Sequence, residues 1–242
     1  MKKKLERQRV LLERMGKNKM YIDSANEKEI VEAFEYGIIK GVTTNPTILL
    51  KEKKERLKQI ESILRINNTT LFVQILGDTS KEMMNDALFI LNNFSKDNLI
   101  LKIPITLEGL KVIKQLRNEK KEVKILGTVI YSANQGIAAG IAGVDFVAPY
   151  VNRMLVNSID AYLEISKMKE YFSNHEINCQ IMGASFKNAN QVSEALISGA
   201  DTVTVPLDIL KQFASNDLAI HAVEVFNQHG KELNNINKMG NE

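Results

Sequence analysis

The chain has 242 residues, of which 44% are hydrophobic and 25% are charged. These values fit one large globular domain, and α/β barrels reach this size as single domains. No apolar run approaches the roughly 18 residues that a membrane span requires, and the single cysteine, Cys179, excludes an internal disulfide framework. We therefore expect a cytoplasmic protein that does not associate with membranes.

The basic charge is concentrated at the start of the chain. Residues 1–19 contain eight Lys or Arg and two Glu residues, whereas the whole chain has a formal net charge of +3. The rest of the chain is therefore mildly acidic, which argues against nucleic acid as the main partner. We expect a disordered basic extension over 1–19, one domain over 20–232 and a polar tail over 233–242. A basic extension that contacts RNA or an acidic partner is the alternative.

Strand-like and helix-like segments alternate along the chain. The apolar, strand-like runs are Met20–Asp23, Gly41–Thr44, Leu71–Leu76, Leu99–Ile103, Val123–Thr128, Asp145–Pro149, Cys179–Ala184 and Thr202–Val205. The helical patterns between them are Glu27–Tyr36, Lys53–Arg65, Ser80–Phe94, Leu107–Asn118, Tyr131–Ala142, Ile159–Phe172, Asn188–Ser198 and Leu207–Phe213, and a last helix covers about His221–Glu232.

This alternation predicts the fold. Strands that alternate strictly with helices form right-handed βαβ units and a parallel sheet. Eight such units without a linker or a change of composition predict a closed (β/α)8 TIM barrel, followed by a C-terminal helix.

Lys102 interrupts an apolar strand and is the first candidate for chemistry. Alternation places it on one face with Ile100 and Pro104, opposite an entirely apolar face. A buried ammonium is costly, so the pKa of a desolvated lysine falls and its free amine can act as a Schiff-base nucleophile. The structural alternative is a lysine that extends to solvent at the strand end.

Other polar residues follow the same strands at their C-terminal ends, where barrels carry their active sites. They are Asp23, Thr43, Thr44, Asn45, Gln74, Thr128, Tyr150, Asn152, Arg153, Ser185 and Lys187. Any one of them could instead cap a helix, support a turn or form a surface ion pair. None of the three histidines lies in a metal-binding pattern, and no nucleotide-binding loop is present, so we expect no metal and no cofactor.

Several segments resemble the transaldolase superfamily, in order and in spacing. They are Tyr21–Ala25, Gly41–Pro46, Lys102–Gly109, Ala148–Arg153 and Gly183–Lys187. Within it the chain is most similar to the short fructose-6-phosphate aldolase/transaldolase-like subgroup, over about residues 20–232. The resemblance implies a class I aldolase barrel whose Schiff-base lysine is Lys102.

Three features favour an aldolase over a transaldolase within that resemblance. Transaldolases of this size usually have Glu where this chain has Gln74, and Phe where it has Tyr150. The segment Leu126–Tyr131 also resembles the aldolases more closely. Glutamine cannot exchange a proton as glutamate can, whereas the tyrosine hydroxyl can. We therefore expect reversible cleavage of fructose 6-phosphate to dihydroxyacetone and glyceraldehyde 3-phosphate.

The resemblance also implies roles for individual residues. Catalysis would depend on Lys102, on Tyr150 as general acid and base through a water held by Gln74 and Thr128, and on Asp23. Substrate binding would involve Asn45 and Thr44 at the sugar hydroxyls, and Arg153, Ser185 and Lys187 at the phosphate. A ring-like homo-oligomer, a pentamer or decamer, is the assembly that the resemblance implies.

One segment departs from the family pattern, and two other functions remain open. After Arg153 the family usually has a loop with Asp and Gly, whereas Met154–Ser158 is shorter and has neither. In the family this loop borders the phosphate end of the site, so the departure bears on phosphate binding and not on Schiff-base chemistry. The first alternative is a transaldolase, which passes the dihydroxyacetone unit to an aldose phosphate. The second is a barrel that binds a sugar phosphate without catalysis.

Overall fold

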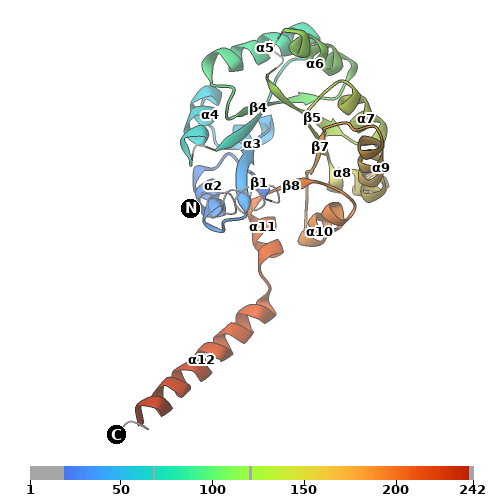
Figure 1. Cartoon of the computed structure of the whole chain (residues 1–242). Coiled ribbons are helices and arrows are strands. Elements are labelled where there is room, and N and C mark those ends of the chain that lie inside the picture. The colour runs from blue at the N-terminus through green and yellow to red at the C-terminus, as the bar shows by residue number, and fades with distance from the viewer. Residues whose placement is uncertain (1–18, 68, 120–121, 240–242) are drawn as a thin grey trace, which may run out of the picture.

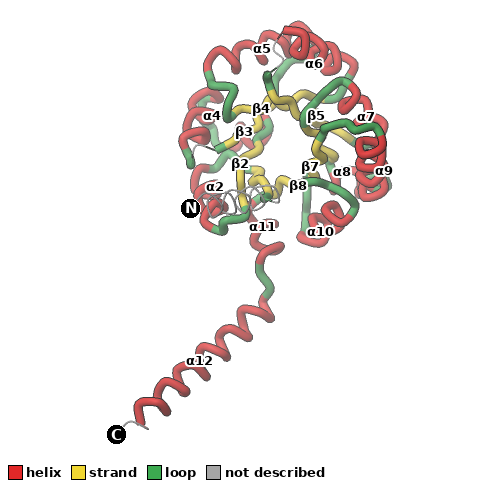
Figure 2. The backbone as a smooth tube through the Cα atoms, in the orientation of Figure 1, coloured by secondary structure: helices red, strands yellow, loops and turns green. Residues whose placement is uncertain are grey.

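A computed structural model describes residues 19–67, 69–119 and 122–239. Eight parallel strands close into a barrel in sequence order, so that β1 pairs with both β2 and β8 (Figure 2). The strands are β1 (Met20–Asp23), β2 (Ile39–Thr43), β3 (Thr70–Gln74), β4 (Leu99–Pro104), β5 (Lys124–Ile130), β6 (Phe146–Pro149), β7 (Gln180–Gly183) and β8 (Thr202–Val205). The predicted (β/α)8 TIM barrel is confirmed.

Helices surround the barrel, and one helix leaves it (Figure 1). They are α2 (Glu27–Glu35), α3 (Pro46–Lys51), α4 (Arg56–Arg65), α5 (Ser80–Asn93), α6 (Leu107–Glu119), α7 (Ala133–Ile141), α8 (Val151–Val156), α9 (Ala161–Asn174), α10 (Ala189–Ile197), α11 (Leu207–Ala214) and α12 (Asp217–Met239). In the described residues, no helix is long and apolar enough to cross a membrane.

The strands bury both faces, which explains their nearly continuous apolar sequences. On β4, the side chains of Leu99, Leu101 and Ile103 belong to the core between the barrel and its helices. Ile100 belongs to a second cluster inside the barrel, which also contains Phe72. The predicted alternation along this strand is confirmed, and it places Lys102 on the inner face.

Two short helices, α3 and α8, occupy segments where we expected none. Asn45 caps α3 by accepting a hydrogen bond from the Ile48 backbone N–H, and Pro46 occupies the first turn. The segment after Arg153 that we expected to be a shortened loop begins inside α8, because the buried side chain of Met154 anchors that helix. The expectation of a loop over Met154–Val156 is therefore wrong.

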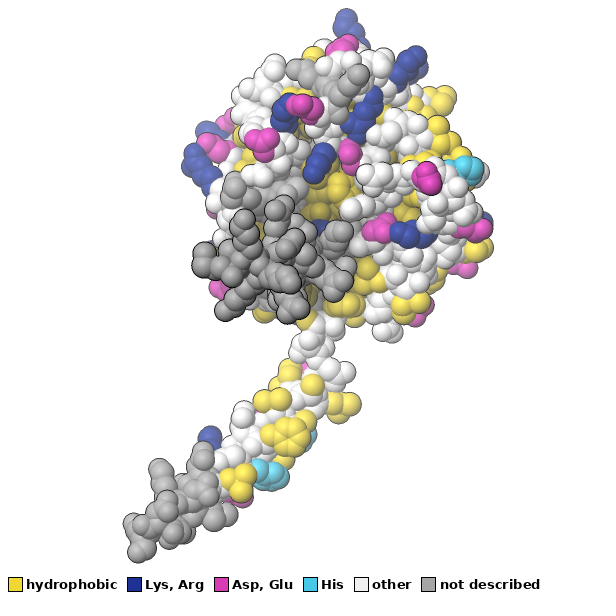
Figure 3. Space-filling model, in the orientation of Figure 1, with side chains coloured by type: hydrophobic (Ala, Val, Ile, Leu, Met, Phe, Trp, Pro, Cys, Tyr) yellow, Lys and Arg dark blue, Asp and Glu magenta, His cyan; other side chains and the backbone are white. Residues whose placement is uncertain are grey.

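The first and last segments of the chain fall partly outside the described residues. Except for Lys19, the expected basic extension lies outside the described residues. Helix α12 projects away from the barrel and includes most of the segment that we expected to be a polar tail. Its apolar side chains include Leu218, Val223 and Phe226, which are 81%, 54% and 69% exposed. Figure 3 shows hydrophobic side chains, in yellow, along this helix.

Candidate active site

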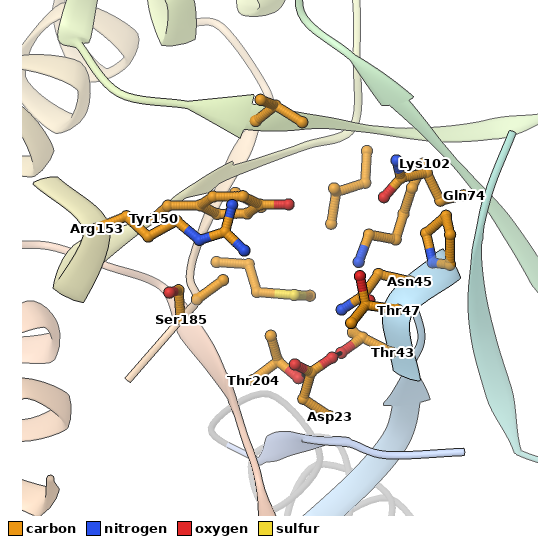
Figure 4. A pocket seen from close by; sticks show the side chains of 16 residues that line it. Asp23, Thr43, Asn45, Thr47, Gln74, Lys102, Tyr150, Arg153, Ser185 and Thr204 are labelled. Atoms are coloured by element: carbon orange, nitrogen blue, oxygen red, sulfur yellow. Dashed lines mark hydrogen bonds between the residues drawn. The ribbon is translucent and has the colours of Figure 1, made fainter. Parts of the chain in front are cut away.

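A cavity of about 300 Å³ opens at the C-terminal ends of the strands. Figure 4 shows polar side chains from different strands around it. It is lined by Asp23, Thr43, Asn45, Pro46, Thr47, Gln74, Lys102, Leu126, Val129, Ala148, Tyr150, Arg153, Met182, Ala184, Ser185 and Thr204. Seven of these residues, namely Asp23, Asn45, Gln74, Lys102, Tyr150, Arg153 and Ser185, are among the sequence-predicted site residues.

Lys102 extends from β4 into this cavity and is only 5% exposed. Its Nζ donates a hydrogen bond to the backbone carbonyl of Thr44, at 2.8 Å. Burial lowers the pKa of the Lys102 ammonium, and the charge of Asp23 partly opposes that decrease. The amine is therefore easier to deprotonate than that of an exposed lysine, as a nucleophilic amine requires.

Asp23 ends β1 and is held by a chain of hydroxyl groups. Thr43 Oγ1 donates to Asp23 Oδ1 at 2.6 Å, and Thr43 Oγ1 lies 2.6 Å from Thr204 Oγ1. Burial raises the pKa of the Asp23 carboxyl, whereas Lys102 and the Thr43 hydrogen bond lower it. The site thus contains a carboxyl and an amine whose pKa values are both shifted, which is frequent at catalytic sites.

Tyr150 and Arg153 form another side of the cavity (Figure 4). The Tyr150 hydroxyl lies 2.9 Å from Thr128 Oγ1, and burial raises the pKa of Tyr150. The guanidinium of Arg153 lies 5.0 Å from the centre of the Tyr150 ring, and its Nη1 donates to the Tyr131 hydroxyl at 3.3 Å. These contacts orient a cation at the cavity mouth, next to Ser185.

Three predicted site residues lie elsewhere than in the lining. Thr44 is fully buried and its hydroxyl donates to the Phe72 carbonyl, so that its backbone, not its side chain, meets Lys102. Thr128 is fully buried behind Tyr150. Lys187 is exposed, and its backbone N–H donates to Gln191 Oε1.

The backbone of β5 is distorted where it borders the cavity. Between the Gly127–Val147 and Ile130–Pro149 pairs, β5 has one residue more than β6. Val129 has a φ of 62°, which is rare for a β-branched residue. The extra residue lets Val129 line the cavity although it directly follows Thr128, whose side chain is also on the inside.

The lining contains residues that the sequence did not single out for the site. Thr204 gave the clearest signal, because it alternates with the buried Val203 and Val205 and therefore faces the interior. Thr43, which the sequence placed among the polar residues at the strand ends without a role, also lines the cavity. Among the described residues, no cluster of His, Cys, Asp and Glu is suited to hold a metal ion.

The fold and the cavity define a (β/α)8-barrel protein with a buried lysine at the C-terminal end of β4. A family model described as Transaldolase/Fructose-6-phosphate aldolase matches residues 20–242. A protein named "Probable transaldolase" from Brachyspira hyodysenteriae is 36% identical over 210 residues, which are 86% of this chain and 95% of that protein. The proteins of the same name from Chelativorans sp. and Brucella melitensis biotype 1 are 33% and 32% identical, over 86% of this chain and 94% of each relative. The chain belongs to the transaldolase/fructose-6-phosphate aldolase family.

Proposed function

We propose that Lys102 forms a Schiff base with the ketone of a sugar phosphate and that the protein cleaves fructose 6-phosphate as an aldolase. One observation carries the Schiff-base chemistry. The Lys102 amine is buried at the cavity, its pKa is lowered, and the Asp23 carboxyl, the one carboxyl in the described cavity lining, interacts with it.

The reaction is proposed to begin with attack of the neutral Lys102 amine on C2 of the open-chain ketose. Loss of water gives an iminium ion. Removal of the C4 hydroxyl proton lets the C3–C4 bond break, and its electron pair moves into the iminium to form an enamine. Glyceraldehyde 3-phosphate leaves. Protonation of the enamine and hydrolysis then release dihydroxyacetone and free lysine. The covalent route divides one difficult carbanion step into easier ones.

Tyr150 is the proposed proton donor and acceptor. Its hydroxyl is next to the Thr128 hydroxyl, and Gln74 lines the same cavity and can hold a water molecule there. Because the pKa of Tyr150 is raised, the phenol keeps its proton near neutral pH and is available as a proton donor. When Tyr150 acts as a base, it needs an activated water.

Binding of the substrate is proposed to use both ends of the cavity. Asp23 and Asn45 orient the hydroxyls of the dihydroxyacetone unit. The backbone carbonyl of Thr44 accepts a hydrogen bond from Lys102 and so helps to position the amine that attacks the substrate. Arg153 and Ser185 hold the phosphate, since guanidinium matches phosphate oxygens in a bidentate way. Lys187 is the more distant helper, exposed outside the cavity lining.

A transaldolase is the second candidate, and the names of the relatives favour it over the aldolase. The two reactions share every step up to the enamine. In a transaldolase, the enamine attacks an aldose phosphate such as erythrose 4-phosphate, whereas in an aldolase it takes up a proton. The side chains favour protonation, because Tyr150 places a hydroxyl in the cavity and Gln74 stands where a carboxylate would be expected in a transaldolase of this size. A barrel that only binds sugar phosphate is the third candidate.

Borohydride trapping tests the shared chemistry. Incubation with fructose 6-phosphate and borohydride should give a covalent adduct, and mass spectrometry of peptides should locate it at Lys102. Lys102→Met should give no adduct. Lys114→Met, which changes an exposed lysine of α6, is the matched control and should be trapped like the wild type. Binding of the sugar phosphate without any adduct would support the non-catalytic candidate.

Turnover without an acceptor distinguishes the two enzymes. Glyceraldehyde 3-phosphate is counted per active site while no aldose phosphate is present. Many turnovers would establish the aldolase. One stoichiometric burst, followed by turnover when erythrose 4-phosphate is added, would establish the transaldolase.

The homo-oligomer also remains a proposal. The exposed apolar side chains of α12, which projects from the barrel, support an assembly in which a second copy covers this helix.

A further inference from the structure

Thr204 lies in the cavity, and the mechanism above gives it no role. It is located on β8, is 3% exposed, and its hydroxyl lies 2.6 Å from that of Thr43. Thr43 in turn donates to Asp23 at 2.6 Å. Because β1 lies between β2 and β8 in the barrel, the three side chains belong to three neighbouring strands, and Figure 4 shows them together at one side of the cavity.

When Asp23 is ionised, the direction of both hydrogen bonds is fixed. An ionised carboxylate only accepts hydrogen bonds, so the single hydroxyl hydrogen of Thr43 is directed to Asp23. Thr43 can then only accept from Thr204, whose hydroxyl must be the donor of the second bond. Both hydroxyl dipoles therefore point toward the carboxylate and stabilise its charged form.

We propose that Thr204 is a positioning residue for the reaction proposed above: its hydroxyl orients Thr43, and through Thr43 it holds Asp23 as an anion turned toward Lys102 and the substrate hydroxyls. This inference rests on the proposed function for its catalytic consequence, but not for the relationship between Thr204 and Asp23. Two hydroxyls thereby replace some of the water that the carboxylate loses when it is buried.

The groups that face Asp23 determine the sign of the expected change. Lys102 from β4 and Lys51 from α3 lower its pKa, and the charge of Asp23 raises that of Tyr150. From β2 and β8 the facing groups are the hydroxyls of Thr43 and Thr204. Burial already raises the pKa of Asp23, so that loss of the hydroxyl chain must raise it further.

Three single variants separate the hydroxyl from the volume of the side chain. Thr204→Val keeps the branched shape without the hydroxyl, and Thr204→Ser keeps the hydroxyl without the methyl group. Thr202→Val is the matched control on the same strand, because the buried Thr202 hydroxyl donates to the Lys19 carbonyl, outside the chain of hydroxyls. Thermal unfolding of each variant confirms that folded protein is compared.

The first readout needs no substrate. In protein with 13C-labelled aspartate carboxyls, the Asp23 resonance is assigned by its absence in Asp23→Asn and is titrated by NMR. We expect Thr204→Val to raise the pKa of Asp23 by about half a unit to one unit, because the variant loses one hydrogen bond between neutral hydroxyls, which acts on the carboxylate through Thr43. Thr204→Ser and Thr202→Val should titrate like the wild type.

The second readout is the pH dependence of kcat for cleavage of fructose 6-phosphate. We expect Thr204→Val to shift the acidic limb upward, to lower kcat about three- to tenfold on that limb, as the expected pKa shift of Asp23 implies, and to leave KM nearly unchanged. Thr204→Ser should restore both kcat and the limb.

Each outcome tests one proposal. An unchanged Asp23 titration in Thr204→Val would overturn the inference, and so would equal losses in the Val and Ser variants, because volume and not the hydroxyl would then matter. If wild-type protein forms no Schiff base, the proposed function fails, while the NMR titration still decides whether Thr204 controls Asp23.

Discussion

The hydroxyl oxygens of Tyr150 and Thr128 lie 2.9 Å apart at the wall of the cavity that Lys102 enters. Tyr150 follows β6 and Thr128 belongs to β5, so two neighbouring strands fix this contact. Thr128 is fully buried and Tyr150 is not, which leaves the phenol as the member of the pair that reaches the substrate.

Removal of the Tyr150 hydroxyl should slow the proton-transfer steps and leave Schiff-base formation intact. We expect Tyr150→Phe to lower kcat by about 100-fold or more, the usual contribution of a general acid or base. Borohydride trapping should remain near wild-type levels. Tyr171→Phe, on α9 away from the cavity lining, is the control. Equal turnover in Tyr150→Phe and wild type would exclude Tyr150 from the proton role.

Arg153 should discriminate phosphorylated from unphosphorylated substrates. We expect Arg153→Met to raise KM for fructose 6-phosphate by about tenfold or more, because a charge-assisted pair is lost, and to change kinetics with unphosphorylated fructose little. Tyr131→Phe should give a smaller increase, since it removes only the hydroxyl that orients the guanidinium. Equal effects on both sugars would place the phosphate elsewhere.

The rate of Schiff-base formation should depend on the ionisation of Lys102. Burial lowers the pKa of its ammonium, so the rate should rise with pH and reach a plateau below the pH at which an exposed lysine loses its proton. Asp23→Asn removes the charge that raises this pKa, and the rise should therefore move to lower pH. Stopped-flow trapping measures the profile. A rise only near the ordinary lysine pKa would contradict a desolvated amine.

The exposed face of α12 should control assembly if a second copy covers it. We expect the wild type to sediment as a multiple of the 27.3 kDa chain, and Val223→Ser with Phe226→Ser to shift the equilibrium toward the monomer. Ile197→Ser is the control, because Ile197 is 78% exposed on α10 and lies on the barrel. Identical sedimentation of the double variant and the wild type would contradict this role.

The fold could be predicted from the sequence because its strongest signal repeats eight times. Strand bounds differ from the predicted ones by one or two residues, and those of β1 and β8 agree. The helices α3 and α8 were missed because six residues are too few to show a helical period. For α3, Asn45 was assigned to substrate binding, with a turn before Pro46 as the structural alternative, although the pair is also a capping residue followed by a proline in the first turn.

The candidate site was predictable where strand alternation decides which face a side chain occupies. Asp23, Gln74 and Lys102 follow that rule and line the cavity. Thr44 directly follows Thr43, so its side chain turns away from the cavity that Thr43 lines. The inner position of Val129 was not predictable, because an extra residue in β5 leaves no trace in the polarity of the sequence.

Val129 has a consequence for engineering the thermal stability of this protein. Its left-handed backbone conformation carries a cost of about 1–3 kcal/mol that the surrounding barrel must offset. Glycine would relieve that strain, but it would also delete an apolar part of the cavity wall. Selection for heat resistance alone would therefore favour glycine at this position, and selection for a well-shaped pocket would oppose it.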